Sequence, residues 1–156
     1  QEAEDFKEAQ ISVEYFNKAP DGYIPCKNLV FYSIAIYYAE VYQLDAIIGS
    51  QIKSDALLYP DASKIFLNSL IHLANTIRLP YNPHPFKIIK PLIELSKEEV
   101  INLAIELEVP LERTWSCYDI HDVHCGKCKG CLERKRSFEK LKIKDPLEVI
   151  ERPHIR

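Results

Sequence analysis

The sequence predicts an α/β protein whose strands run parallel. Helical and strand-like segments alternate between residues 28 and 109, as in proteins whose parallel strands are joined by crossover helices. The first strand-like run, LDAIIGS at residues 44–50, is short, β-rich and ends in glycine, which suits a buried strand of a parallel sheet. Two strands make a very small sheet, so we expect more strands from missing sequence or a partner.

Composition fits a single soluble globular domain. The 156 residues are 47% hydrophobic and 28% charged, and they contain neither a membrane-length apolar run nor a signal-peptide pattern. A net charge of −3 gives no general attraction to nucleic acid. The five cysteines are clustered and odd in number, which favours a metal-binding or catalytic role in a reducing cytoplasm over a disulfide scaffold.

We expect three regions along the chain. Residues 1–20 are polar and charge-mixed, typical of an arm or a variable insertion; residues 21–110 hold the α/β portion; residues 111–156 hold the cysteines and a tail. The sequence has no methionine and begins with glutamine. Because natural chains start with methionine, we expect a processed or truncated product.

The first predicted helix covers residues 28–43, after a turn at DGYIP (21–25), with Asn28 as its N-cap. It is apolar almost all round, which predicts burial on most faces. A loop follows at residues 50–61.

Asp61 is the predicted cap of a second helix, residues 62–78, with an apolar stripe at Ile65, Leu67, Leu70, Ile71, Ala74 and Ile77. Three prolines at residues 80–85 end this helix. FKIIKPLI at residues 86–93 reads as the second strand. Ser96 and Glu99 then form the capping box of a third helix.

Four cysteines follow with the spacing Cys117-x7-Cys125-x2-Cys128-x2-Cys131. Two residues between thiolates let both sulfurs reach one ion, and a helix starting near Cys128 would place Cys128 and Cys131 on one face. Four thiolates fit a closed tetrahedral zinc site, whose zinc would be structural because it keeps no open position.

Three other interpretations of these cysteines stay open. An iron–sulfur cluster uses similar spacings, although its fourth cysteine usually lies downstream and precedes proline. His121 or His124 could replace one thiolate. The four thiols could also be unligated in a reduced chain. Cys26 stands apart and fits a small buried apolar residue.

Basic residues crowd the same region: Lys127, Lys129, Arg134, Lys135, Arg136 and Lys140. A zinc element with a basic helix could bind nucleic acid. Glu133 and Glu139 dilute the charge and aromatic residues are sparse, so we do not expect direct nucleic-acid binding.

Several motifs resemble those of the 7-cyano-7-deazaguanine synthase family. They are, in chain order, YIPCKNLVFYSIAIYYAE, DAIIGS…YPD, PLIELSKEEV and TWSCY…HCGKCKGCLERKRSF. The likeness runs in order from Tyr23 to about Pro146. It implies a Rossmann-like fold of the adenine nucleotide α-hydrolase (PP-loop) type, one structural zinc held by the four cysteines, and a homodimer.

The resemblance also implies a carbon–nitrogen ligase. Such an enzyme activates 7-carboxy-7-deazaguanine with ATP and Mg²⁺ as an adenylate, takes ammonia to form an amide, and dehydrates the amide to the nitrile used for queuosine or archaeosine. Lys27, Asn28, Asp55 and Asp61 are the substrate-binding candidates. No catalytic base can be named.

The sequence also departs from the family pattern. The S-G-G-x-D-S loop that grips ATP phosphates through backbone N–H groups is missing from these residues. Lys27 stands where the family has arginine, and Ser63 stands where arginine is expected after Asp61. The loop segment could be truncated or lie on a separate subunit; alternatively, the chain could be a zinc-stabilised binding module or a relative with another acceptor.

Overall fold

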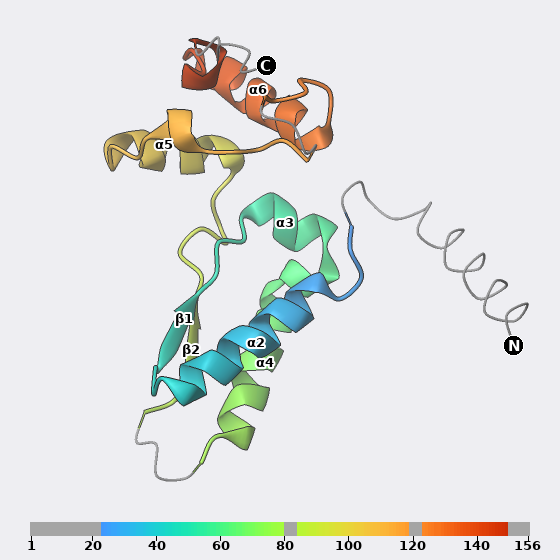
Figure 1. Cartoon of the computed structure of the whole chain (residues 1–156), viewed down its shortest axis with the longest axis vertical. Coiled ribbons are helices and arrows are strands. Elements are labelled where there is room, and N and C mark those ends of the chain that lie inside the picture. The colour runs from blue at the N-terminus through green and yellow to red at the C-terminus, as the bar shows by residue number, and fades with distance from the viewer. Residues whose placement is uncertain (1–22, 80–83, 119–122, 150–156) are drawn as a thin grey trace, which may run out of the picture.

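The computed structural model describes residues 23–79, 84–118 and 123–149 (Figure 1). The polar arm expected at residues 1–20 lies outside these ranges, as do Asp21 and Gly22 of the expected turn. Among the described helices, none combines the length and the apolar character needed to cross a membrane.

The two predicted strands form a parallel pair. β1 (Ala46–Ile48) and β2 (Lys87–Ile89) pair with Ile47 opposite Ile88. The chain passes between them through helix α4 (Lys64–Ile77), so this part is a β–α–β unit. The predicted α/β class is therefore confirmed at the level of a small parallel sheet with helices.

The core lies where two helices meet one face of this sheet. α2 (Lys27–Val41) and α4 run beside the strands in Figure 1, and Leu67, Ala74 and Phe86 are almost completely buried between them. Asn75 fixes the entry to β2, because its side-chain amide donates to the carbonyl of Phe86 and accepts from the N–H of the same residue. Of the predicted stripe on α4, Ile65 and Ile77 are exposed and Ile71 is half-buried.

Helix α2 differs from its prediction at its start and on its surface. Its N-cap is Cys26, in the left-handed region at φ 52°, and not Asn28. Only Tyr32 and Ala39 are buried, whereas Phe31 and Tyr37 are 61% and 63% exposed. Burial on most faces was therefore wrong for the described residues, because α4 and the sheet cover only one side of α2.

Among the described residues, helices cover the sheet on one face only. Ile88 is buried, but the neighbouring pair Ile48 and Ile89 are 74% and 47% exposed. Parallel sheets usually carry helices on both faces. The expectation of a buried strand is therefore wrong for β1 as the described residues are arranged.

The predicted loop after β1 contains two helical segments, α3 (Lys53–Leu58) and the 3₁₀ helix η1 (Pro60–Ala62). Asp61 lies in η1 and does not cap α4. The cap is Ser63, whose hydroxyl accepts the N–H of Phe66. Serine at position 63 thus has a local structural role where the family pattern has arginine.

The last elements form a separate pair of helices. α5 (Lys97–Glu106) begins with the predicted capping box, in which Ser96 and Glu99 each accept the other's backbone N–H. α6 (Lys129–Leu141) packs against α5, away from α2 and α4 (Figure 1). Short 3₁₀ helices, η2 (Leu111–Arg113) and η3 (Pro146–Val149), pack together near α6.

Candidate functional site

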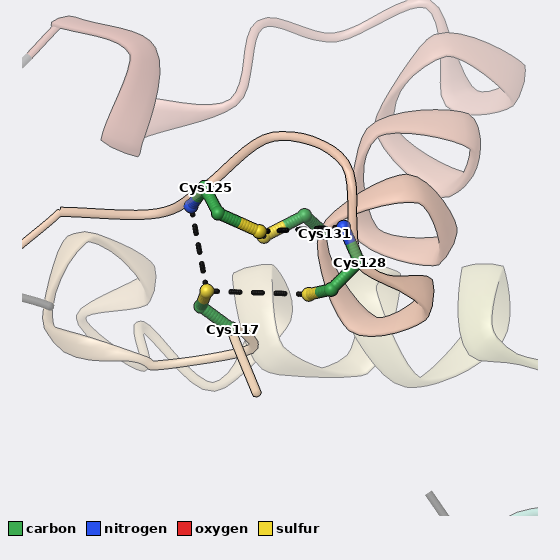
Figure 2. Close-up of side chains that lie close together, drawn as sticks. All are labelled: Cys117, Cys125, Cys128 and Cys131. Carbon is green, nitrogen blue, oxygen red and sulfur yellow. Dashed lines mark hydrogen bonds between the residues drawn. The ribbon is translucent and has the colours of Figure 1, made fainter. Parts of the chain in front are cut away.

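The four predicted cysteines converge at the start of α6. Their sulfurs all lie within 4.8 Å of one another, and the Cys125–Cys131 and Cys117–Cys128 Sγ pairs are each 4.0 Å apart. A tetrahedral zinc site with Zn–S bonds of about 2.3 Å has sulfur–sulfur edges of about 3.8 Å. The sulfurs face one another (Figure 2), so they are placed to share one metal ion.

Local backbone geometry brings the thiols together. Gly126 adopts φ +71°, which glycine reaches at no steric cost. The turn that it allows lets the N–H of Cys128 donate to the Cys125 sulfur at 3.3 Å. The N–H of Cys125 donates to the Cys117 sulfur at 3.4 Å. As predicted, α6 starts beside Cys128, which is its N-cap.

The local environments of Cys128 and Cys131 give their thiols different pKa values. Backbone N–H donors, first that of Tyr118 and then that of Cys131, lower the pKa of Cys128 to about 6. Burial raises the pKa of the Cys131 thiol to about 12. Because metal ligands must be thiolates, binding of a metal ion at neutral pH has to displace at least the Cys131 proton.

His124 is not part of the four-thiol cluster. Its Nε2 accepts the N–H of Ser116 at 3.4 Å, and its ring packs edge-on against Trp115. The alternative in which His124 replaces a cysteine is therefore disfavoured by its contacts. His121 lies outside the described residues.

A buried ion pair joins α6 to the chain on either side of it, from Thr114 before the cysteines (the cysteine segment, residues 114–131) to Asp145 after the helix. Arg134 of α6 donates from Nε and Nη2 to the two carboxylate oxygens of Asp145, at 2.6 and 2.7 Å. Its Nη1 donates to the hydroxyl of Thr114 at 2.6 Å. Burial acts to raise the pKa of Asp145, but hydrogen bonds from Arg134 and from the Leu147 N–H hold that pKa below its ordinary value.

Gly130 allows α6 to approach the segment that carries Cys117. A Cβ at this position would lie 1.9 Å from the carbonyl oxygen of Ser116. No side chain fits there without movement of the backbone. Glycine at position 130 therefore sets how closely the two cysteine-bearing segments meet.

A cavity of about 540 Å³ lies beyond the carboxyl end of β1. Its walls come from the N-terminus of α2, the segment after β1, helix α3, η1 and Tyr118 of the cysteine segment. Ligands of open α/β sheets bind at this end of the strands. Gly49 lets α2 come close here, because a Cβ would lie 2.2 Å from the Tyr32 hydroxyl.

All four predicted substrate-binding residues line this cavity: Lys27, Asn28, Asp55 and Asp61. Asp61 Oδ2 accepts the backbone N–H of Asn28 at 3.0 Å, so it caps α2 across 33 residues of sequence. Asp55 Oδ2 accepts the N–H of Ile52 at 3.0 Å and so caps α3. Each aspartate thus uses one carboxylate oxygen to fix the backbone of the cavity wall.

Our sequence-based candidates omitted three tyrosines of this cavity. Tyr23 and Tyr59 lie with parallel rings, 6.4 Å between centroids, and Tyr118 comes from the cysteine segment. The sequence offered one signal for two of these tyrosines, namely that each is next to a motif residue. Tyr59 precedes the Pro60-Asp61 pair, and Tyr118 follows Cys117. The stacking itself joins residues 36 positions apart and left no local pattern.

Most of the basic side chains near the cysteines have partners within the chain. Arg134 is buried against Asp145, and Lys140 lies 2.9 Å from Glu98. Lys135 lies 4.0 Å from Glu139, and Lys129 donates to the Tyr59 hydroxyl at 3.1 Å. The ion pairs with Asp145, Glu98 and Glu139 reduce the positive charge available to a phosphate backbone.

A cavity at the carboxyl end of a parallel strand, beside four converging thiols, defines an α/β protein with a candidate metal site. Comparison with known sequences narrows this class, because the family model described as "Queuosine biosynthesis protein QueC" matches residues 2–142. The chain therefore belongs to the QueC family.

Curated relatives share the name 7-cyano-7-deazaguanine synthase. The chain is 40% identical to the protein of Methanobrevibacter smithii over 133 residues, 85% of this chain and 57% of that protein. It is 38% identical over 130 residues to the protein of Prochlorococcus marinus subsp. pastoris, 82% of this chain and 58% of that protein. It is 37% identical over 129 residues to the Sulfolobus acidocaldarius protein, 81% of this chain but 27% of that protein.

The chain thus spans little more than half the length of the first and second of these relatives, and about a quarter of the third.

Proposed function

We propose that this chain supplies the substrate-binding and zinc-bearing part of a carbon–nitrogen ligase that makes 7-cyano-7-deazaguanine from 7-carboxy-7-deazaguanine and ammonia. The observation that carries the proposal is the cavity at the end of β1, where Lys27, Asn28, Asp55 and Asp61 meet. The membership in the QueC family supports it.

The chemistry of the cavity complements that substrate. A 7-deazaguanine presents neighbouring N–H donors on its guanine-like edge, and carboxylates such as Asp55 and Asp61 are strong acceptors for such donors. Lys27 at the N-terminus of α2 offers a positive charge for the substrate's carboxylate. Binding of this kind positions the carboxylate for activation.

In the proposed reaction, a carboxylate oxygen attacks the α-phosphorus of Mg²⁺-bound ATP and pyrophosphate leaves. Ammonia then displaces AMP to give the amide, and loss of water gives the nitrile. We assign no catalytic base. We propose that the phosphate-gripping loop comes from a segment outside these 156 residues.

Two uncovered apolar surfaces support such a segment. They are the outer side of α2, with Phe31 and Tyr37, and the open sheet face, with Ile48 and Ile89. Burying apolar area of this kind stabilises a fold by roughly 25 cal/mol per Å². We propose that the segment with the phosphate loop covers these surfaces, and that the complete protein is a cytoplasmic homodimer.

The activity is tested on the full-length protein with 7-carboxy-7-deazaguanine, Mg²⁺-ATP and ammonium, with the nitrile detected by mass spectrometry. Replacing Lys27→Met should lower kcat/KM about 10- to 100-fold, the size expected for one charged hydrogen bond. Lys53→Met, an exposed lysine on α3, is the matched control. Absence of nitrile, together with salt-dependent RNA binding, would instead support a nucleic-acid-binding module.

We also propose that the four thiols hold one structural zinc. They fit the ion because their spacing and N–H···S contacts suit a closed four-sulfur shell. Metal analysis should find about one zinc per chain, and Cys131→Ser should lose it, whereas Cys26→Ser, outside the cluster, should keep it. Iron and a brown colour would identify an iron–sulfur cluster instead.

A further inference from the structure

Lys129 links the cysteine cluster to the cavity. It directly follows Cys128 and is the first residue of α6. Its Nζ donates to the hydroxyl of Tyr59 at 3.1 Å and lies 5.3 Å from the centroid of the Tyr59 ring. The two residues are 70 positions apart, so this contact joins the metal-binding segment to the α/β part of the chain.

Tyr59 is placed to matter for ligand binding. It lies between α3 and η1, lines the cavity, and its ring is parallel to that of Tyr23 within 2°. The backbone also ties the cavity to the cluster, because Tyr118 lines the cavity and its N–H donates to the Cys128 sulfur at 3.4 Å. Two residues next to thiols, Tyr118 and Lys129, therefore reach the cavity or its wall.

We propose that Lys129 is a positioning residue that holds Tyr59 in place, so that the Tyr23–Tyr59 pair offers a fixed aromatic wall to the flat bicyclic base of the substrate. The proposal rests on the proposed function for the identity of that base. One ammonium group makes both contacts, the hydrogen bond to the hydroxyl and the approach to the ring, so it constrains the hydroxyl end of the tyrosine. A wall ordered in advance binds more tightly, because less rotamer entropy is lost on binding.

The experiment measures the Kd of 7-cyano-7-deazaguanine by titration calorimetry on the zinc-loaded, full-length protein. Lys129→Met keeps the aliphatic stem but removes the charge and the donor, and it should weaken binding about 3- to 30-fold. Lys129→Arg keeps both features and should restore most of the affinity. Lys127→Met makes the same charge change at an exposed lysine two residues before Lys129 and should leave Kd unchanged.

A double-mutant cycle separates positioning from a general structural effect. If Lys129 acts through Tyr59, Lys129→Met should have no further effect on Kd in a Tyr59→Leu background. Zinc content and melting temperature should stay constant across the series. Should Lys129→Met fail to fold, Tyr59→Phe removes the acceptor oxygen alone and should weaken binding in the same direction.

The outcomes distinguish the two proposals. A wild-type protein that does not bind the deazaguanine would overturn the proposed function and this inference together. Wild-type binding with equal Kd values for Lys129→Met and Lys127→Met would overturn only the role of Lys129. Additive effects of Lys129→Met and Tyr59→Leu would overturn it as well.

Discussion

At the scale of single residues, the Arg134–Asp145 pair is a buried ion pair that stabilises the fold around α6. Both side chains are about nine-tenths buried, and Arg134 also reaches Thr114 and the carbonyl of Leu111. Such a pair contributes little over an apolar substitute, but breaking it leaves an uncompensated buried charge. The pair joins α6 to the segment before Cys117, which explains why an arginine stands on the buried face of α6, with Cys131, Ser137 and Phe138.

We therefore expect Asp145→Asn to lower the free energy of unfolding of the zinc-loaded protein by about 3–5 kcal/mol. Urea titration measures the change. The control is Lys135→Ala, which removes an exposed ion pair with Glu139 and should cost about 0–1 kcal/mol. Equal losses for the two variants would contradict a structural role for the buried pair.

The same pair predicts a pH dependence of stability. The pKa of Asp145 is lowered in the folded state, so its contribution is complete above the unfolded value of about 3.9 and is lost as pH falls through the folded value. The gap in unfolding free energy between wild type and Asp145→Asn should stay constant from about pH 5 to 8 and narrow below about pH 4. If the difference in unfolding free energy between wild type and Asp145→Asn instead widened as pH falls, the Asp145 pKa would be raised in the folded state and not lowered.

At the scale of elements, Gly130 reverses an ordinary propensity. Glycine inside a helix normally costs about 1 kcal/mol relative to alanine, so Gly130→Ala should stabilise an isolated α6. In the folded chain, the new Cβ would lie 1.9 Å from the Ser116 carbonyl, and overpacking of this kind costs about 1–3 kcal/mol or more. We therefore expect the cost of the clash to exceed the gain in helix propensity.

We expect Gly130→Ala to lower the melting temperature and to weaken zinc retention against a chelator. Gly126→Ala is the comparison: its Cβ meets nothing within 4 Å, and its cost of about 1–2 kcal/mol comes from the positive φ alone. A Gly130→Ala protein with a higher melting temperature than wild type would mean that α6 and the Cys117 segment lie farther apart.

Elements with local signals were predictable from the sequence. The Ser96–Glu99 capping box and the start of α6 at the Cys-x2-Cys-x2-Cys run depend on residues three apart. α3 was missed because a six-residue helix is marginal alone and depends on tertiary contacts. The side-chain hydrogen bond that caps α2 was missed for a similar reason, because its acceptor, Asp61, is 33 residues away in sequence from the Asn28 N–H.

The cavity contains residues that could be named from the sequence and contacts that could not. Motif resemblance named Lys27, Asn28, Asp55 and Asp61, and the fold gathers all four at the end of β1. The Tyr23–Tyr59 stack and the Lys129 contact arise only when distant segments meet, so no spacing in the sequence announces them.

At the scale of the whole molecule, the exposed apolar side of α2 allows a test of whether the proposed loop-bearing segment covers this chain. Phe31 is 61% exposed in the described structure. If the segment with the phosphate loop covers it, Phe31→Glu buries an unpaired charge in the full-length protein and should cost several kcal/mol of unfolding free energy there. In the 156-residue chain alone the same change should be within about 0.5 kcal/mol and should improve solubility.

Parallel urea titrations of both chain lengths measure this difference, with the exposed Lys144→Glu as a control that should be near neutral in each. Equal, small effects of Phe31→Glu in both lengths would show that nothing covers α2. A 156-residue chain that sediments as a dimer and dissociates with Phe31→Glu would identify a second copy as the occupant. Either occupant, the loop-bearing segment or a second copy, would bury this surface. Only coverage by the loop-bearing segment makes the effect of Phe31→Glu depend on chain length, because only the longer chain then buries that side chain.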